Sequence, residues 1–78
     1  MMMQEKLDAL AEDIRAAYGV TLTFQDVAAA AKCSATTARR AFWRGELVGS
    51  RFAKGGPVRF TARAVAAWLL DGERRAMA

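Results

Sequence analysis

The chain has few of the residues on which many small folds and active sites depend. Its 78 residues include one cysteine, Cys33, and no histidine. A single cysteine excludes an internal disulfide, and a zinc site needs several Cys or His ligands at set spacings. The basic part of the chain also lacks paired carboxylates and a glycine loop of the kind that cradles phosphates. We therefore expect no enzyme, no metal and no cofactor.

Long apolar runs are also missing. No stretch approaches the roughly 20 apolar residues that a membrane-spanning helix needs. The first residues, MMMQEKLDALAEDIRAAYG, contain acidic side chains throughout and lack the apolar block of a signal peptide. These absences predict a protein without a membrane partner, located in a reducing cytoplasm.

Hydrophobic residues make up 54% of the chain, enough for a small core without a disulfide. A chain of this length buries only about 60% of the surface that its unfolded state exposes, so its core has little margin. We expect residues 1–78 to form a single domain.

The net charge of +4 is concentrated in the middle of the chain. Residues 32–63 contain eight lysines and arginines and one acidic residue, Glu46. Residues 1–31 contain two basic and five acidic residues, and the charges of residues 64–78 cancel. A basic block beside an acidic segment is typical of a surface that binds a polyanion, although a merely solvated surface would have the same composition.

Apolar residues at steps of three and four predict an amphipathic first helix over residues 2–18. A short extended piece, VTLT, follows. Thr23 is placed to cap a second helix, FQDVAAAAK, with Asp26 at the reciprocal position of a capping box. Ser34 is placed to cap a third helix, ATTARRAFWR, which Gly45 ends. Two short helices joined by about three residues have helix-turn-helix spacing.

A hairpin and a last helix complete the predicted fold. LVGSRF and VRF are short strand candidates, and AKGGP between them supplies the turn. Thr61 is placed to cap a helix, ARAVAAWLLDG, whose buried stripe is Val65, Trp68 and Leu69. The fold class predicted is mainly α: a winged helix-turn-helix over residues 22–72, with a two-stranded β wing, an accessory helix at 2–18 and a frayed tail at 73–78.

Helical geometry separates two faces of the third helix. Ala38, Ala41, Phe42 and Gly45 fall on one face, which we expect to pack on the preceding helix. The opposite face and its flanks hold Thr36, Thr37, Arg39, Arg40, Trp43 and Arg44. Because unpaired arginines are rarely buried, the three arginines of this face are predicted to be exposed.

Such a face has the chemistry to bind double-stranded DNA. Arginine bridges guanine in the major groove, and a helix N-terminus with the hydroxyls of Ser34, Thr36 and Thr37 suits phosphates. Arg51 and Lys54 of the wing suit an adjacent minor groove; a plain solvated hairpin is the alternative. Arg59 is expected either to bind phosphate or to pair with Glu46.

Two other side chains have more than one interpretation. Trp43 is predicted to pack partly buried on the wing or the last helix, or else to contact DNA or a neighbouring copy of the protein. Cys33 is predicted to be a small buried turn residue rather than a reactive thiol, since nothing near it in the sequence could act as its base.

The run from Leu22 to Leu70 resembles the small winged-helix DNA-binding domains of the excisionase and MerR-like group. The segments that carry the resemblance are TFQDVAAAAK, TTARR, GEL, GGPVRF and AVAAWL. The resemblance implies that one set of residues lines the major groove and another shapes the wing. The first set is Thr36, Thr37, Arg39, Arg40 and Arg44; the second is Arg51, Lys54, Gly55, Gly56 and Arg59.

The function that the resemblance implies is that of a phage excisionase, or recombination directionality factor. Such a protein binds attachment-site DNA in a bacterial host, often as several neighbouring copies, and bends it so that the integrase works toward excision. A small MerR-like or BldC-like transcriptional regulator is the first alternative, and a basic adaptor for an acidic protein partner is the second. The first helix is expected to cover the core of its own domain or to touch a neighbour's basic surface.

Overall fold

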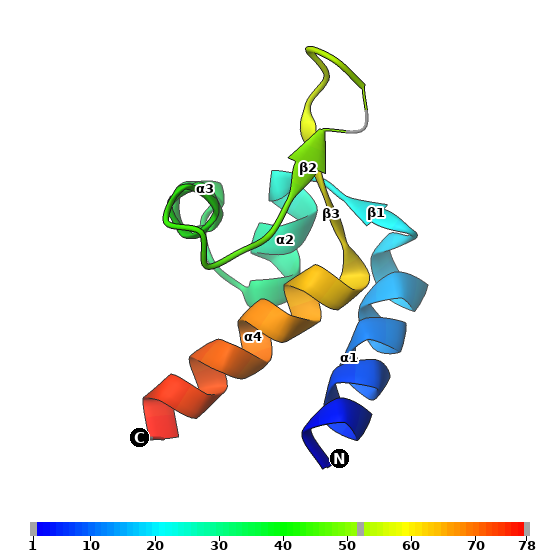
Figure 1. Ribbon diagram of the computed structural model, residues 1–78, viewed down its shortest axis with the longest axis vertical. Helices are drawn as coiled ribbons and strands as arrows, with labels where there is room; N and C mark the ends of the chain where they lie inside the picture. Colours follow the sequence, from blue (N-terminus) through cyan, green and yellow to red (C-terminus); the bar gives the residue numbers. More distant parts are fainter. Residues whose placement is uncertain (1, 52, 78) are drawn as a thin grey trace.

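The computed structural model describes residues 2–51 and 53–77, and the side chains from Gln4 to Glu73 apart from residue 52. In this part of the chain, the order of elements is a helix, a short strand, two helices, two short strands and a last helix (Figure 1). The elements are α1 (Met2–Tyr18), β1 (Thr21–Leu22), α2 (Phe24–Ala31), α3 (Ala35–Trp43), β2 (Ser50–Arg51), β3 (Val58–Thr61) and α4 (Ala62–Met77). In Figure 1, α1 and α4 lie at one end, the β2–β3 wing at the other, and α3 to one side. This arrangement is a winged helix-turn-helix with an additional N-terminal helix.

The helix-turn-helix begins with the predicted capping box. The Thr23 hydroxyl accepts a hydrogen bond from the Asp26 amide at 3.1 Å, and the Asp26 carboxylate accepts one from the Thr23 amide at 3.0 Å. The pair satisfies two amides that the first turn of α2 would otherwise leave without an acceptor. At the other end, Lys32 has a left-handed φ of 55°, which turns the chain toward α3.

The ends of α3 also follow from single residues. The Ser34 hydroxyl accepts from the Thr37 amide at 3.1 Å and caps the helix as predicted. Beyond Arg44, Gly45 takes a φ of 79°. Its amide donates to the Phe42 carbonyl at 3.0 Å, and the amide of Glu46 donates to the Ala41 carbonyl at 2.9 Å. This pair of bonds is a Schellman motif, which glycine forms readily because it has no Cβ.

The described residues form a sheet of three strands in the order β1-β3-β2, one strand more than the predicted wing. Thr21 pairs with Thr61 and Leu22 with Phe60, while Ser50 pairs with Arg59 and Arg51 with Val58. The extended VTLT segment was predicted, but its partner was not, because a two-residue strand has no periodicity that specifies pairing with a segment nearly 40 positions away. Phe52, predicted to end the first wing strand, lies outside the described residues.

The core lies where α2, α3, α4 and the sheet meet. Leu22, Val27, Leu47, Phe60 and Val65 are its largest fully buried side chains. The rings of Phe24, Phe42 and Phe60 pack edge to face, with centroids 5.0–5.8 Å apart. Such ring pairs stabilise by about 0.5–1.5 kcal/mol beyond the area that they bury.

Helix α4 differs from its prediction in two ways. Its buried face is Ala62, Val65 and Ala66, whereas Trp68 and Leu69 are only half-buried at the edge of the core. It also continues to Met77, past the end predicted at Gly72. Residues 73–77 are Glu, Arg, Ala and Met, which all favour helix, so one glycine does not end it; Ala78 lies outside the described residues.

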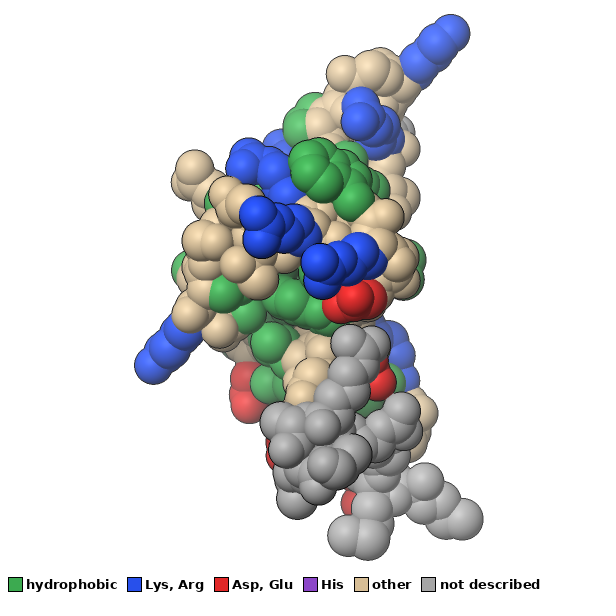
Figure 2. Space-filling model, turned by 90° about the vertical axis from the view of Figure 1, so that its left-hand side faces the viewer, with side chains coloured by type: hydrophobic (Ala, Val, Ile, Leu, Met, Phe, Trp, Pro, Cys, Tyr) green, Lys and Arg blue, Asp and Glu red, His purple; other side chains and the backbone are tan. Residues whose placement is uncertain are grey.

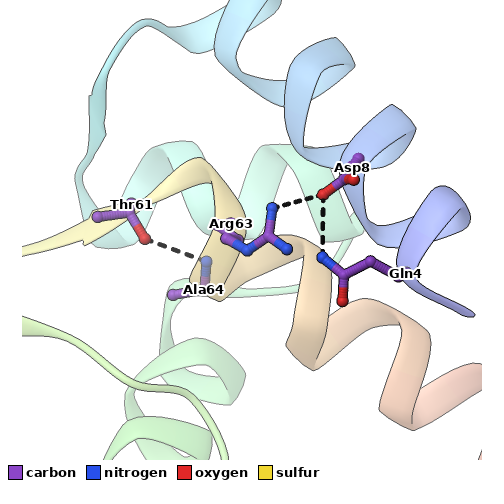
Figure 3. Close-up of polar contacts among 5 residues, drawn as sticks. All are labelled: Gln4, Asp8, Thr61, Arg63 and Ala64. Atoms are coloured by element: carbon purple, nitrogen blue, oxygen red, sulfur yellow. Dashed lines mark hydrogen bonds and ion pairs between the residues drawn. The ribbon is translucent and has the colours of Figure 1, made fainter. Parts of the chain in front are cut away.

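Helix α1 packs along α4 and places Ile14 in the core, so the prediction that it covers its own domain is confirmed. Figure 3 shows the polar link between the two helices. Arg63 Nη1 donates to Asp8 Oδ1 at 2.6 Å, and Gln4 Nε2 donates to the same oxygen at 3.3 Å. Nearby, the Thr61 hydroxyl accepts from the Ala64 amide at 3.1 Å, which confirms Thr61 as the cap of α4. None of the helices in residues 2–77 is both long and apolar enough to span a membrane.

Candidate nucleic-acid interface

The two faces of α3 separate as its sequence predicts. Ala38 is fully buried, Ala41 is 6% exposed, and Phe42 packs against the core. The side chains predicted to face outward are all exposed: Thr36, Thr37, Arg39, Arg40, Trp43 and Arg44. The exception on the packing side is Gly45, which is exposed because the helix has already ended at Trp43. The small alanines let α3 approach α2 closely on its packing face. The long cationic side chains lie on the opposite face and extend into solvent.

Figure 2 looks onto the side of the molecule on which α3 lies. Lysine and arginine side chains gather over its middle and upper parts, which correspond to α3 and the wing. Most of the acidic side chains visible in this view lie lower, toward α1 and α4. The charge asymmetry of the sequence is therefore also an asymmetry of this surface.

The hydroxyls at the start of α3 are exposed and bonded to each other. Ser34 Oγ and Thr37 Oγ1 lie 3.0 Å apart, and the same Ser34 oxygen caps the helix. A ligand at this end would therefore meet a fixed pair of hydroxyls beside the free Thr36 side chain.

The tip of the wing is a tight turn of residues 53–56. The Gly56 amide donates to the Ala53 carbonyl at 2.9 Å, and Gly55 takes a φ of 76°. A positive φ at the third position is a feature of a type II turn. Lys54 precedes this glycine and is exposed, and Arg51 braces the loop by donating from Nη1 to the Gly56 carbonyl at 3.2 Å.

A shallow groove between α3, the wing and the start of α2 brings together arginines from three elements. Its lining includes Arg39 of α3, Arg51 of β2 and Arg59 of β3, with Thr23, Phe24 and Gln25 along α2. The Arg39 guanidinium lies over the Phe24 ring, with Cζ 5.3 Å from the ring centroid, at a cation–π distance. We call this the three-arginine groove. The sequence predicts each arginine singly, but their meeting depends on the return of β3 past α2, which no local pattern encodes.

Trp43 corrects one prediction. Its side chain is 74% exposed, so it does not pack on the wing or on α4. The side chain leaves α3 on the outer face, beside Arg40 and Arg44, where no other element covers it. Val48, after the end of α3, is also 70% exposed.

Two other residues of the basic block lie apart from this face. Cys33 is half-buried in the turn between α2 and α3 and is a free thiol. Arg63 is paired with Asp8 on α1, so its charge is partly compensated. Elsewhere on α1, Arg15 donates hydrogen bonds to Glu12. These bonds and the positive charge of Arg15 lower the pKa of Glu12, while the same bonds and the negative charge of Glu12 raise the pKa of Arg15.

Among the described residues no group of three His, Cys, Asp or Glu side chains is placed to hold a metal ion. What the α3 face and the wing offer instead is a set of guanidinium, ammonium, hydroxyl and amide donors. Donors of this kind bind phosphate oxygens and the acceptor edges of bases.

Comparison with known proteins agrees with this chemistry. Residues 21–72 match a family described as a helix-turn-helix domain, and these residues span β1 through most of α4. No curated protein and no solved structure matches the chain. The matched family is a DNA-binding family that includes excisionase-like proteins and is typically non-enzymatic. Because the match covers well over half of the sequence, the chain belongs to this helix-turn-helix family.

Proposed function

We propose that the chain is a sequence-specific, DNA-bending architectural protein of the phage excisionase type. In this proposal α3 enters the major groove, where Arg40 and Arg44 meet base edges and Thr36 and Thr37 meet the backbone. The wing enters the adjacent minor groove with Lys54 and Gly55 at its tip. Trp43 lies against the sugar-phosphate edge of the groove, and Ser34 holds the start of the helix close to a phosphate.

The observation that carries the proposal is the exposure of the cationic face of α3 beside the wing. An α-helix with its side chains is about 10–12 Å in diameter, which fits the major-groove width of about 12 Å, and the nine residues of α3 extend it by about 13.5 Å. Burial of Ala38 and Ala41 on the opposite side holds this helix on the domain. A projecting helix of this size, flanked by a basic hairpin, has the geometry for contact with both grooves.

The architectural role follows from the small size of the unit. A single module covers only about 600–1,000 Å² on DNA, and a few base contacts do not give tight, selective binding alone. Neighbouring copies on the DNA and an integrase are the partners that would supply the remaining affinity. Inserting the wing into the minor groove would favour a bend. A narrowed minor groove has a more negative potential, so cationic side chains inside it stabilise the bent form of the DNA.

A circular-permutation gel shift on DNA from the neighbouring attachment site tests the proposal. We expect complexes whose mobility depends on the position of the site in the fragment, which reports binding and curvature together. Binding without curvature would favour the transcriptional regulator that uses the same fold. No binding to any duplex, even at low salt, would contradict the proposal and favour a protein-interaction adaptor.

A further inference from the structure

The three-arginine groove brings three positive charges to one small part of the surface. Arg39, Arg51 and Arg59 come from three separate elements and line one shallow space. None of the described residues that line it is acidic. Like charges that share a groove repel one another, and a bound anion would remove that repulsion.

Two of the guanidinium groups are held in place before any ligand arrives. Arg39 lies against the Phe24 ring, and Arg51 uses one N–H group on the Gly56 carbonyl. A guanidinium has five N–H donors, so the remaining donors of Arg51 are available to an acceptor in the groove. Side chains that are already oriented lose less entropy when they bind.

The floor of the groove adds backbone donors. Thr23, Phe24 and Gln25 line it, and they form the cap and first turn of α2. Thr23 satisfies the amides of Asp26 and Val27, at 3.1 and 3.0 Å. The amides of Phe24 and Gln25 come before the first residue of α2 whose N–H has an acceptor within the helix. Their N–H groups lie at the positive end of the helix dipole, where an anion is favoured. The carboxylate of Asp26 is half-buried in the capping box and does not line the groove.

We propose that the three-arginine groove is a binding site for a single phosphodiester group, which rests on the proposed DNA-binding function. The phosphate belongs to the DNA strand that passes between α3 and the wing, and it is held by Arg39, Arg51 and Arg59 with the first amides of α2. Paired N–H groups of a guanidinium match two phosphate oxygens at once. The site fixes how deeply α3 lies in the major groove. In this arrangement Arg39 contacts the DNA backbone rather than a base.

A first experiment tests the site without DNA. Inorganic phosphate is titrated into the intact protein at constant ionic strength, with chloride as the balancing anion, and amide and arginine Nε–H resonances are followed by NMR. We expect saturable shifts at Phe24 and Gln25 and at the three arginines, with affinity reduced about fivefold or more in Arg59→Gln and in Arg39→Gln. Arg63→Gln is the matched control: it removes the same charge at the α1–α4 contact and should leave the phosphate affinity unchanged.

A second experiment uses DNA as the source of the phosphate. A duplex obtained by selection from random sequence is made with a neutral methylphosphonate at one backbone position at a time. We expect methylphosphonate at one backbone position per bound copy to weaken binding about tenfold for the original protein and for Arg63→Gln. The same replacement should weaken binding less than twofold for Arg59→Gln and Arg39→Gln, which have already lost a contact to that phosphate.

The outcomes separate this proposal from the proposed function. Tight duplex binding with no backbone position coupled to Arg39 or Arg59 would overturn the phosphate site and leave DNA binding intact. If the protein bound no duplex but its resonances shifted saturably with phosphate, the DNA-binding function would be overturned and an anion site in the groove would be retained. If the chemical-shift changes caused by phosphate did not saturate, or were the same in every variant, the phosphate site would be overturned whatever the DNA result.

Discussion

At the scale of single residues, α3 shows how side-chain size and charge divide one short helix between two tasks. Ala38 and Ala41 are buried and small, which brings the helix backbone close to α2. Arg40 and Arg44 occupy the outer side, where they remain hydrated until a ligand displaces the water. Substitutions on the outer side should therefore change binding without changing the fold.

Arg40 and Lys54 are expected to fail in different ways when replaced by alanine. Arg40→Ala should reduce the preference among DNA sequences, since one good bidentate contact to guanine contributes about 1–3 kcal/mol of discrimination. Lys54→Ala should weaken binding to all duplexes by a similar factor, because a phosphate contact carries no sequence information. Affinities for the selected duplex and for scrambled duplexes measure both effects, and the opposite pattern would contradict the groove assignments.

Single residues also show where reasoning from sequence fails. The exposure of the α3 arginines follows from helical periodicity and the cost of burying charge, so it could be predicted. The position of Trp43 could not, because a large aromatic side chain is as compatible with packing as with exposure until its neighbours are known. Its 74% exposure follows from its place on the outer face of α3, where none of the described elements packs over it.

At the scale of elements, the helices could be predicted more fully than the sheet. Caps at Thr23, Ser34 and Thr61 are local signals, and each forms the predicted hydrogen bond. The pairing of β1 with β3 is non-local, and it places Leu22 opposite Phe60 in the core. That same pairing positions β3 along α2. The sequence therefore predicted Arg39, Arg51 and Arg59 as separate DNA-binding residues, but it did not predict the groove in which they meet.

Two glycines are expected to respond to alanine with opposite signs. A Cβ on Gly49 would lie 2.5 Å from Phe60 Cε1 and 2.9 Å from Val58 Cγ1, in the packed junction of β2 and β3. Gly49→Ala should therefore destabilise the protein by about 1–3 kcal/mol through overpacking. Gly72→Ala in α4 meets nothing within 4 Å and should stabilise it by up to about 1 kcal/mol through helix propensity. Denaturant titration measures both, and equal effects would show that the contact at Gly49 relaxes freely.

Helix α4 depends on Val65 for its attachment to the core. Val65→Ala removes two methyl groups from a fully buried site and should cost about 2–3 kcal/mol, or about 10 °C or more in Tm. Val48→Ala is the matched control, because the same substitution at a 70% exposed side chain should change stability by less than about 0.5 kcal/mol. A similar Tm for both variants would mean that α4 is not held by this contact.

At the scale of the whole molecule, the chain separates its charges between two ends. The acidic helix α1 packs against α4, where Asp8 pairs with Arg63, and lysine and arginine side chains gather over α3 and the wing. Attraction of a polyanion is therefore directional, which favours approach with α3 foremost. The same separation keeps the acidic helix away from the face on which we place the DNA.

This separation makes a salt titration informative about orientation as well as charge. The logarithm of the duplex binding constant should fall linearly with the logarithm of salt concentration, with a slope of about −0.9 for each phosphate neutralised. Arg59→Gln should make this slope shallower by about one such unit, because the phosphate held in the three-arginine groove would keep its counterion. Arg63→Gln lowers the net charge of the chain by the same amount, yet its guanidinium lies at the α1–α4 contact, so the slope should not change. If both variants changed the slope equally, binding would depend on net charge alone, and the α3 face would have no privileged role in it.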